Sequence, residues 1–181
     1  MCEAGYPPGF SLPAVRTLAL TFLVFGSCFF THAEENTVQL LLEAQPGRGD
    51  KMMVAVWLED KNGHFVETVE ICSQAVKHYK ELREWSRQRR EKEGNKVVAA
   101  MVGATIRWGG KRVVEIPAQR NGRNLLDGNH VIRIESARDK GQRFIDFKIP
   151  IPKDFKGGTF QHRGYVARAT VRVPNGEKPE K

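Results

Sequence analysis

The chain has 181 residues, of which 40% are hydrophobic and 28% charged, and it carries a formal net charge of +8 at pH 7. Glu3 and Arg16 are the only charged residues among the first 33, so the remainder keeps the whole charge and is long enough for one domain with a substantial core. Cys2 and Cys28 also lie in that N-terminal segment, which leaves Cys72 alone and excludes an internal disulfide in the remainder.

Residues 17–30 form an uncharged apolar segment directly after Arg16. The segment is shorter than the roughly 20 apolar residues of a spanning helix, and the following "THA" offers small residues to a signal peptidase. We therefore predict a signal peptide over residues 1–33, cleaved after Ala33, and export to the periplasm or the extracellular space. The alternatives are an uncleaved membrane anchor and a lipid anchor on Cys28.

Apolar and polar residues alternate with a period of two along most of the remaining chain, which is typical of β-strands. The pattern predicts strands at residues 38–44, 53–59, 64–72, 111–116, 130–137, 144–151 and 165–173. The second of them is almost continuously apolar, which favours a central place in a sheet. Turn signals between the strands, including Asn62 and Gly63 of a tight hairpin, indicate a two-sheet sandwich. We expect one domain over residues 34–173 and a flexible charged tail over 174–181.

The alternation also predicts which side chains face the core. In the third strand we expect Phe65, Val69 and Ile71 on one face. In the last strand Ala167, Ala169, Val171 and Val173 alternate with Arg168, Thr170 and Arg172, which indicates one buried and one cationic, solvated face. Trp57 and Val171 should accordingly lie inward, and Arg168 and Arg172 outward.

Residues 74–93 break the strand pattern. Apolar side chains recur there at every third position, namely Val76, Tyr79, Leu82 and Trp85. This spacing predicts a helical insertion that packs on the sandwich and stops at Gly94 and Asn95. The cations of this segment include Arg87, Arg89, Arg90 and Lys92. They fit a nucleic-acid or lipid-headgroup site, but Glu91 and Glu93 dilute the charge, so a solvated helix face is the preferred interpretation and no nucleic-acid partner is expected.

Side chains with catalytic chemistry are scattered along the chain. The histidines at 64, 78, 130 and 162 lie too far from one another and from cysteine for the usual spacing of a compact metal site. Ser73 and Ser86 lack the glycines of a nucleophile elbow, and Gly109 with Gly110 predicts a hairpin or bulge. Cys72 is expected to be a small buried hydrophobe. We predict a noncatalytic protein without a metal or a bound cofactor.

Five segments stand out in chain order: "MVAVWLEDKNGHFVETVEI", "YKELREW", "VGAT", "GGKRVVEI" and "RNGRNLLDGNHVIRIESARDKGQ". Together they resemble the exported bacterial family called domain of unknown function 2271, over residues 38–173. The latter half is also similar to the immunoglobulin-like domain of flagellar hook-capping proteins. These resemblances imply an exported, mainly β protein, an immunoglobulin-like β-sandwich with one short helical insertion. They imply no enzymatic activity.

The resemblance also implies a second possible function. Relatives are encoded beside flavin transferases and membrane proteins with PepSY domains, which implies an extracytosolic redox setting, an envelope or membrane partner and a transferase that acts on the chain. Family members carry a D-x-x-T-G-A-T motif in which the threonine hydroxyl attacks a pyrophosphate and becomes linked to FMN.

Gly103, Ala104 and Thr105 match this motif, whereas Ala99 and Val102 replace its aspartate and first threonine. Residues 97–102 are also apolar enough for a buried strand, which we prefer. The sequence thus favours a noncatalytic binding or accessory module of the cell envelope. The alternative is a flavin-bearing accessory of electron transfer with FMN on Thr105.

Overall fold

The structure is a computed structural model that describes residues 37–48, 52–73, 76–93, 102–103, 105–120, 122–138 and 141–174. All of these residues fall in the unit Ala33–Lys181. The predicted signal peptide, the end of the predicted tail and the helix stop at residues 94–95 lie outside the described residues.

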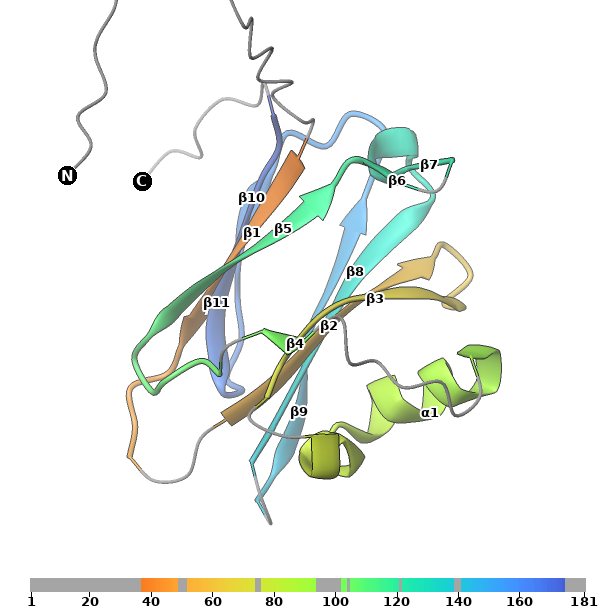
Figure 1. Cartoon of the computed structure of the whole chain (residues 1–181). Helices are drawn as coiled ribbons and strands as arrows, with labels where there is room; N and C mark the ends of the chain where they lie inside the picture. Colours follow the sequence, from red (N-terminus) through yellow and green to blue (C-terminus); the bar gives the residue numbers. More distant parts are fainter. Residues whose placement is uncertain are drawn as a thin grey trace, which may run out of the picture. The chain divides into compact units, whose positions relative to one another are not determined.

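Two antiparallel sheets pack face to face, as Figure 1 shows. The first sheet has the order β10 (Gly158–Gln161), β11 (Val166–Arg172), β1 (Thr37–Ala44) and β5 (Lys111–Pro117). The second has the order β3 (Phe65–Cys72), β2 (Met52–Asp60), β8 (His130–Arg138) and β9 (Arg143–Ile151), and the two-residue β4 (Val102–Gly103) joins β3 in parallel at the edge. The pair β6 (Gln119–Arg120) and β7 (Arg123–Asn124) precedes a short 3₁₀ turn, η3 (Leu125–Asp127). The prediction of a mainly β sandwich is confirmed.

Strand β2 is buried on both faces, which explains its continuous apolar sequence. One face contributes to the core between the sheets, which contains Leu40, Leu42, Val54, Val56, Leu58, Ile132, Ile134, Ile149 and Val171 among others. The other face, with Met53, Ala55 and Trp57, belongs to a second cluster that includes Leu82 and Trp85. The second sheet therefore lies between two apolar layers.

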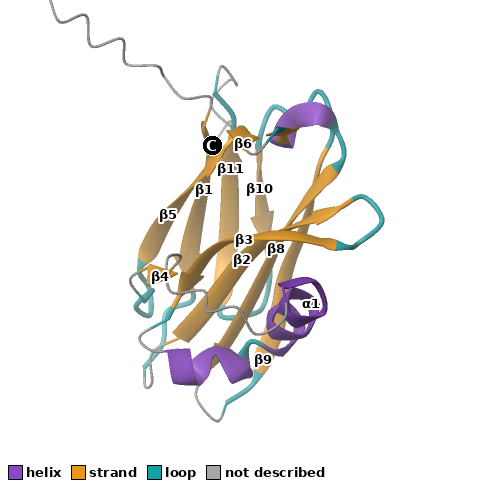
Figure 2. Cartoon of the chain, turned by 45° about the vertical axis from the view of Figure 1, so that its right-hand side comes forward, coloured by secondary structure: helices purple, strands orange, loops and turns teal. Residues whose placement is uncertain are grey.

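The helical segment forms the outer cover of that sheet, as Figure 2 shows. The predicted single helix over 74–93 is two pieces, the 3₁₀ helix η1 (Val76–Glu81) and the α-helix α1 (Arg83–Glu93). Tyr79, Leu82 and Trp85 of the predicted apolar stripe are buried against β2 and β3, as expected. Trp85 and Tyr79 meet edge to face with ring centroids 5.5 Å apart. The spacing of the stripe thus located the contact face but not the break between the pieces.

Most predicted side-chain directions and turns are confirmed. Trp57 and Val171 are fully buried, and Arg168 and Arg172 are exposed. Trp57 lies beneath the helical segment rather than between the sheets. Gly63, with φ of +86°, sits in the predicted hairpin between β2 and β3, and the turn at Trp108 and Gly109 precedes β5.

Some side-chain directions were predicted wrongly because bulges reverse the alternation. In β3 the register pairs Val56 with Glu70 and Trp57 with Thr68, so Val69 is an extra residue that packs on the core between the sheets. Phe65 and Ile71 lie on the opposite face, in the cluster beneath the helix.

In β11 a bulge leaves Ala167 without a partner in β1, and Val166 takes its place in the core. Thr170, expected in solvent, is buried, and its hydroxyl lies 3.1 Å from that of Thr159 on β10. The sequence did not predict strand β10, which pairs with β11 in the same sheet and places Thr159 beside Thr170.

Candidate functional site

The segment with the proposed FMN threonine lies at one edge of the second sheet. Val102 and Gly103 pair in parallel with Ile71 and Cys72. Thr105 follows outside any strand and is half-buried. Ala104 and residues 97–101 lie outside the described residues, so the interpretation of 97–102 as a buried strand stays a prediction, although Val102 itself stands in β4.

Cys72 next to this segment is buried, as expected. Its thiol lies 3.5 Å from Oε1 of Glu70, to which it donates. Burial, with the charge of Glu70 as a second cause, raises the pKa of Cys72 to about 12. The thiol therefore stays protonated at neutral pH, and the structure supports its role as a small buried hydrophobe.

A half-buried hydroxyl outside the strand is compatible with attachment of FMN, which would contribute redox chemistry. Gly103 and Thr105 are the described residues of the motif, and Gly103 lies two positions before Thr105 at the sheet edge. The carboxylate and first hydroxyl that family members offer are absent from the sequence at Ala99 and Val102. The site thus supplies a half-buried threonine and a nearby glycine but lacks two polar groups of the motif.

A second candidate site lies on the solvent side of α1. A shallow groove of about 440 Å³ is lined by Lys80, Arg83, Ser86, Arg87 and Arg90, and we call these five residues the cationic groove. Its four basic side chains are exposed. Arg83, Arg87 and Arg90 follow the spacing i, i+4, i+7, which places them on one face of the helix. The helix therefore turns its aromatic face to the sheet and a line of guanidinium groups to solvent.

The charges of the cationic groove are only partly neutralised. Arg87 forms ion pairs with Glu84 at 2.6 Å and with Glu91 at 2.8 Å. The hydrogen bond from Arg87 lowers the pKa of Glu84. Arg90 donates to the backbone carbonyl of Ser86 at 3.2 Å. Within the described part of the chain, neither Lys80 nor Arg83 has a carboxylate within ion-pair distance, so the groove keeps a net positive charge.

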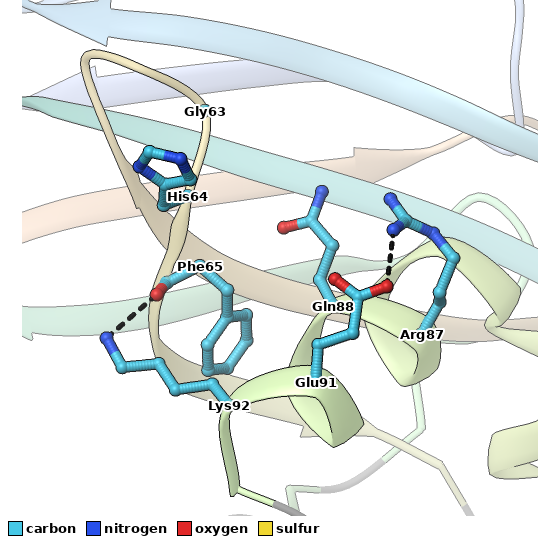
Figure 3. A pocket seen from close by; sticks show the side chains of 7 residues that line it. All are labelled: Gly63, His64, Phe65, Arg87, Gln88, Glu91 and Lys92. Atoms are coloured by element: carbon cyan, nitrogen blue, oxygen red, sulfur yellow. Dashed lines mark hydrogen bonds and ion pairs between the residues drawn. The ribbon is translucent and has the colours of Figure 1, made fainter.

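A neighbouring pocket of about 550 Å³ lies between the β2–β3 hairpin and α1 (Figure 3). It is lined by Gly63, His64, Phe65, Arg87, Gln88, Glu91 and Lys92. Two contacts join residues of the pocket: Lys92 donates to the carbonyl of Phe65 at 2.9 Å, and Arg87 pairs with Glu91. The pocket is therefore lined by side chains of both charges, whereas the charged residues that line the cationic groove are all basic.

A buried carboxylate fixes the start of α1. Oε1 and Oε2 of Glu135 on β8 accept hydrogen bonds from the backbone N–H groups of Glu84 at 3.3 Å and Trp85 at 2.9 Å. The N-terminal amides of a helix otherwise lack acceptors, so Glu135 acts as a cap supplied by the sheet. Burial raises the pKa of Glu135, although these amides act in the opposite direction. The cap explains why the α-helix begins at Arg83 rather than at residue 74.

A second buried carboxylate joins the middle of α1 to the sheet. Oε1 of Glu59 accepts hydrogen bonds from Nε1 of Trp57 at 3.1 Å and Nε2 of Gln88 at 3.0 Å. Its other oxygen lies 3.4 Å from a guanidinium nitrogen of Arg133, which also lies over the Trp57 ring. Glu59 is 1% exposed, so these bonds form away from water. Together with Glu135 they hold the helix in one orientation on the sheet.

Other reactive side chains do not gather into a site. Within the ranges described, no three His, Cys, Asp or Glu residues are grouped to hold a metal ion. Each of three histidines lies near one aspartate: His64 with Asp60, His130 with Asp127 and His162 with Asp146. None of the described helices is both long and apolar enough to cross a membrane.

Fold and surface together define a β-sandwich protein that carries a cationic groove on a helix fastened to one sheet. Within that class, the chain belongs to the family called domain of unknown function 2271, whose model matches residues 35–168. The family is described as a predicted periplasmic protein. No curated protein and no solved structure matches the chain significantly, so the similarity to flagellar hook-capping proteins has no support.

Sequence reasoning found Arg87 and Arg90 of the cationic groove but did not single out Lys80 and Arg83. The spacing of Arg83, Arg87 and Arg90 was visible in the sequence once a helix was expected. Glu135 gave no such signal, because it stands in a strand 50 residues from its partner Trp85.

Proposed function

We propose that the protein is a noncatalytic binding module of the cell envelope and that the cationic groove is its contact surface. The observation that carries the proposal is that two buried carboxylates attach α1 to the second sheet. Buried Glu135 and Glu59 fix the helix, while Lys80, Arg83 and Arg90 face solvent. A helix held in this way presents its charges without the entropic cost of ordering a mobile segment on binding.

Export is part of the proposal. The family's description as a predicted periplasmic protein and the apolar segment at residues 17–30 both support it. The signal peptide should be removed after Ala33, so that the mature chain begins at Glu34. The intact mass of the exported protein tests this point, and a chain that retains residues before Arg16 would contradict it.

Site-specific photocrosslinking in living cells tests the contact surface. A photoreactive amino acid replaces Glu91 on α1 in one strain and Glu115 on β5 in another, and both positions are exposed glutamates. Glu91 pairs with Arg87 of the cationic groove, whereas Glu115 lies on the first sheet, away from the helix. We expect an adduct with an envelope component, identified by mass spectrometry, from position 91 alone. Adducts from neither position, or equally from both, would overturn the proposal.

A second candidate function is electron transfer by FMN linked to Thr105. It is supported by the position of Thr105, which lies outside β4 and is only half-buried. The missing polar groups at positions 99 and 102 count against it. We therefore place it second.

A further inference from the structure

We propose that the cationic groove docks the protein on the anionic phospholipid headgroups of a membrane surface. This inference rests on the proposed function and names the partner of the same groove. It concerns adsorption to the membrane surface through charge, with no insertion of protein into the bilayer.

The groove offers cations along one line on one side of the molecule. Arg83, Arg87 and Arg90 occupy one face of α1, and Lys80 of η1 extends the line toward the N-terminal end of the helix. The opposite face of the helix is buried through Trp85 and Leu82. Because all four side chains are exposed on the same surface, an extended anionic surface can contact them together, whereas a single small anion can contact only some.

The chemistry of the side chains fits phosphate diesters. Three of the four cations are arginines, whose planar guanidinium groups bind phosphate oxygens in a bidentate manner. Lys80 and Arg83 have no carboxylate within ion-pair distance among the described residues. Arg87 pairs with Glu84, which is half-buried, and with Glu91, which is exposed. The side chain of Glu91 is 63% exposed, so water screens this pair and phosphate competes for Arg87.

The composition of the groove favours a lipid surface over a protein or a nucleic acid. Specific protein interfaces bury an apolar or aromatic centre, and single-stranded nucleic acids stack on aromatic rings. The groove contains neither, and the large hydrophobic residues exposed in the described structure, Val113 and Ile145, do not line it. Adsorption to anionic headgroups requires only clustered basic side chains near the membrane surface.

Cosedimentation of the full exported chain with vesicles tests the proposal. We expect binding to vesicles that contain phosphatidylglycerol and phosphatidylcholine, no binding to phosphatidylcholine alone, and loss of binding as salt rises. Each basic residue near an anionic surface changes the partition constant about fivefold. The double variant Arg83→Gln/Arg90→Gln should therefore bind roughly 25-fold more weakly. These side chains are exposed, so the variant should keep its fold.

The control is Arg163→Gln/Arg172→Gln, which removes the same charge from exposed positions on β11 and the loop before it. It should retain most of the binding, and an equal loss in both variants would show that only net charge matters. Absence of binding to anionic vesicles would overturn the headgroup inference. In that case a protein adduct from position 91 in the crosslinking experiment would still support the binding module, so the two proposals fail separately.

Discussion

Glu135 on β8 caps the helix through Trp85: its Oε2 accepts a 2.9 Å hydrogen bond from the Trp85 backbone N–H, while the Trp85 indole donates to Thr68 on β3. One tryptophan thus bonds to two strands of the same sheet. These two bonds act together with the apolar contacts beneath the helix to set the orientation of the cationic groove.

Replacement of Glu135 by alanine should lower the free energy of unfolding by about 1–3 kcal/mol, because two helix amides lose their acceptor. Glu135→Gln keeps an acceptor oxygen and should cost less. Urea unfolding measures both values, and hydrogen exchange should show reduced protection of the Glu84 and Trp85 amides in the alanine variant alone. Unchanged protection there would contradict the capping role.

Asp146 should make the protein less stable as the pH rises. It is the extra residue of a bulge in β9, its carboxylate is buried, and burial raises its pKa from 3.8 to about 7. His162 lies 3.5 Å away, and the nearby charge of Glu135 acts in the same direction as burial. The folded state binds this proton more tightly than the unfolded state. The contribution of Asp146 to stability is therefore greatest below pH 3.8, and it decreases as the pH rises from 3.8 to about 7.

Asp146→Asn should remove that decline and be more stable than the parent above pH 7, by up to about 4 kcal/mol. Chemical unfolding of both proteins across this pH range measures the difference. The same pH dependence in both would show that Asp146 is not the group responsible.

The last strand offers a matched test of the core. Val171 is fully buried between the sheets, so Val171→Asp places an unpaired charge there and should cost about 3–5 kcal/mol. The adjacent Arg172 is exposed, and Arg172→Glu should change stability by less than about 0.5 kcal/mol. Thermal unfolding compares the two, and similar losses would mean that the faces of β11 are assigned wrongly.

Co-expression with a flavin transferase should leave most of the protein colourless, because Ala99 and Val102 lack the polar groups of the motif. Ala99→Asp with Val102→Thr should raise the labelling of Thr105 if the transferase reaches this segment. If the two side chains are instead buried, the same changes should lower stability. Absorbance and peptide mass measure the fraction of Thr105 that carries FMN. Full labelling of the unaltered chain at Thr105 would favour electron transfer over the binding module as the function.

Local pattern was enough to predict the strands but not their order or their irregularities. The alternation in residues 38–44 and 144–151 found β1 and β9 to within a residue, because each has one face in the core. Strand β10 was missed, since its four residues alternate only between exposed and half-buried positions. Val69 and Ala167 were misplaced because a bulge depends on the register with the partner strand, which single-strand periodicity does not contain.

The candidate site was predictable only in part for a similar reason. The motif around Thr105 and the basic run that contains Arg87 and Arg90 are short local patterns, so both were found, whereas Lys80 and Arg83 lie before that run and were not singled out. The helix cap from Glu135 and the hydrogen bond between Glu59 and Gln88 connect residues far apart along the chain, and a glutamate in a strand gives no local indication of such a partner.

The place of β1 sets the order in which the domain can assemble. The first strand of the sandwich pairs on one side with β5 and on the other with β11, the last strand of the fold. Native pairing of β1 therefore waits for segments far along the chain, and folds dominated by such nonlocal pairs form slowly. In a chain that crosses a membrane N-terminus first, Leu40 and Leu42 would emerge before both partner strands. The edge of β1 that pairs with β11 would stay open to aggregation until residue 172 follows. A chain exported in this way would expose one edge of its first strand for the interval between the emergence of β1 and that of β11.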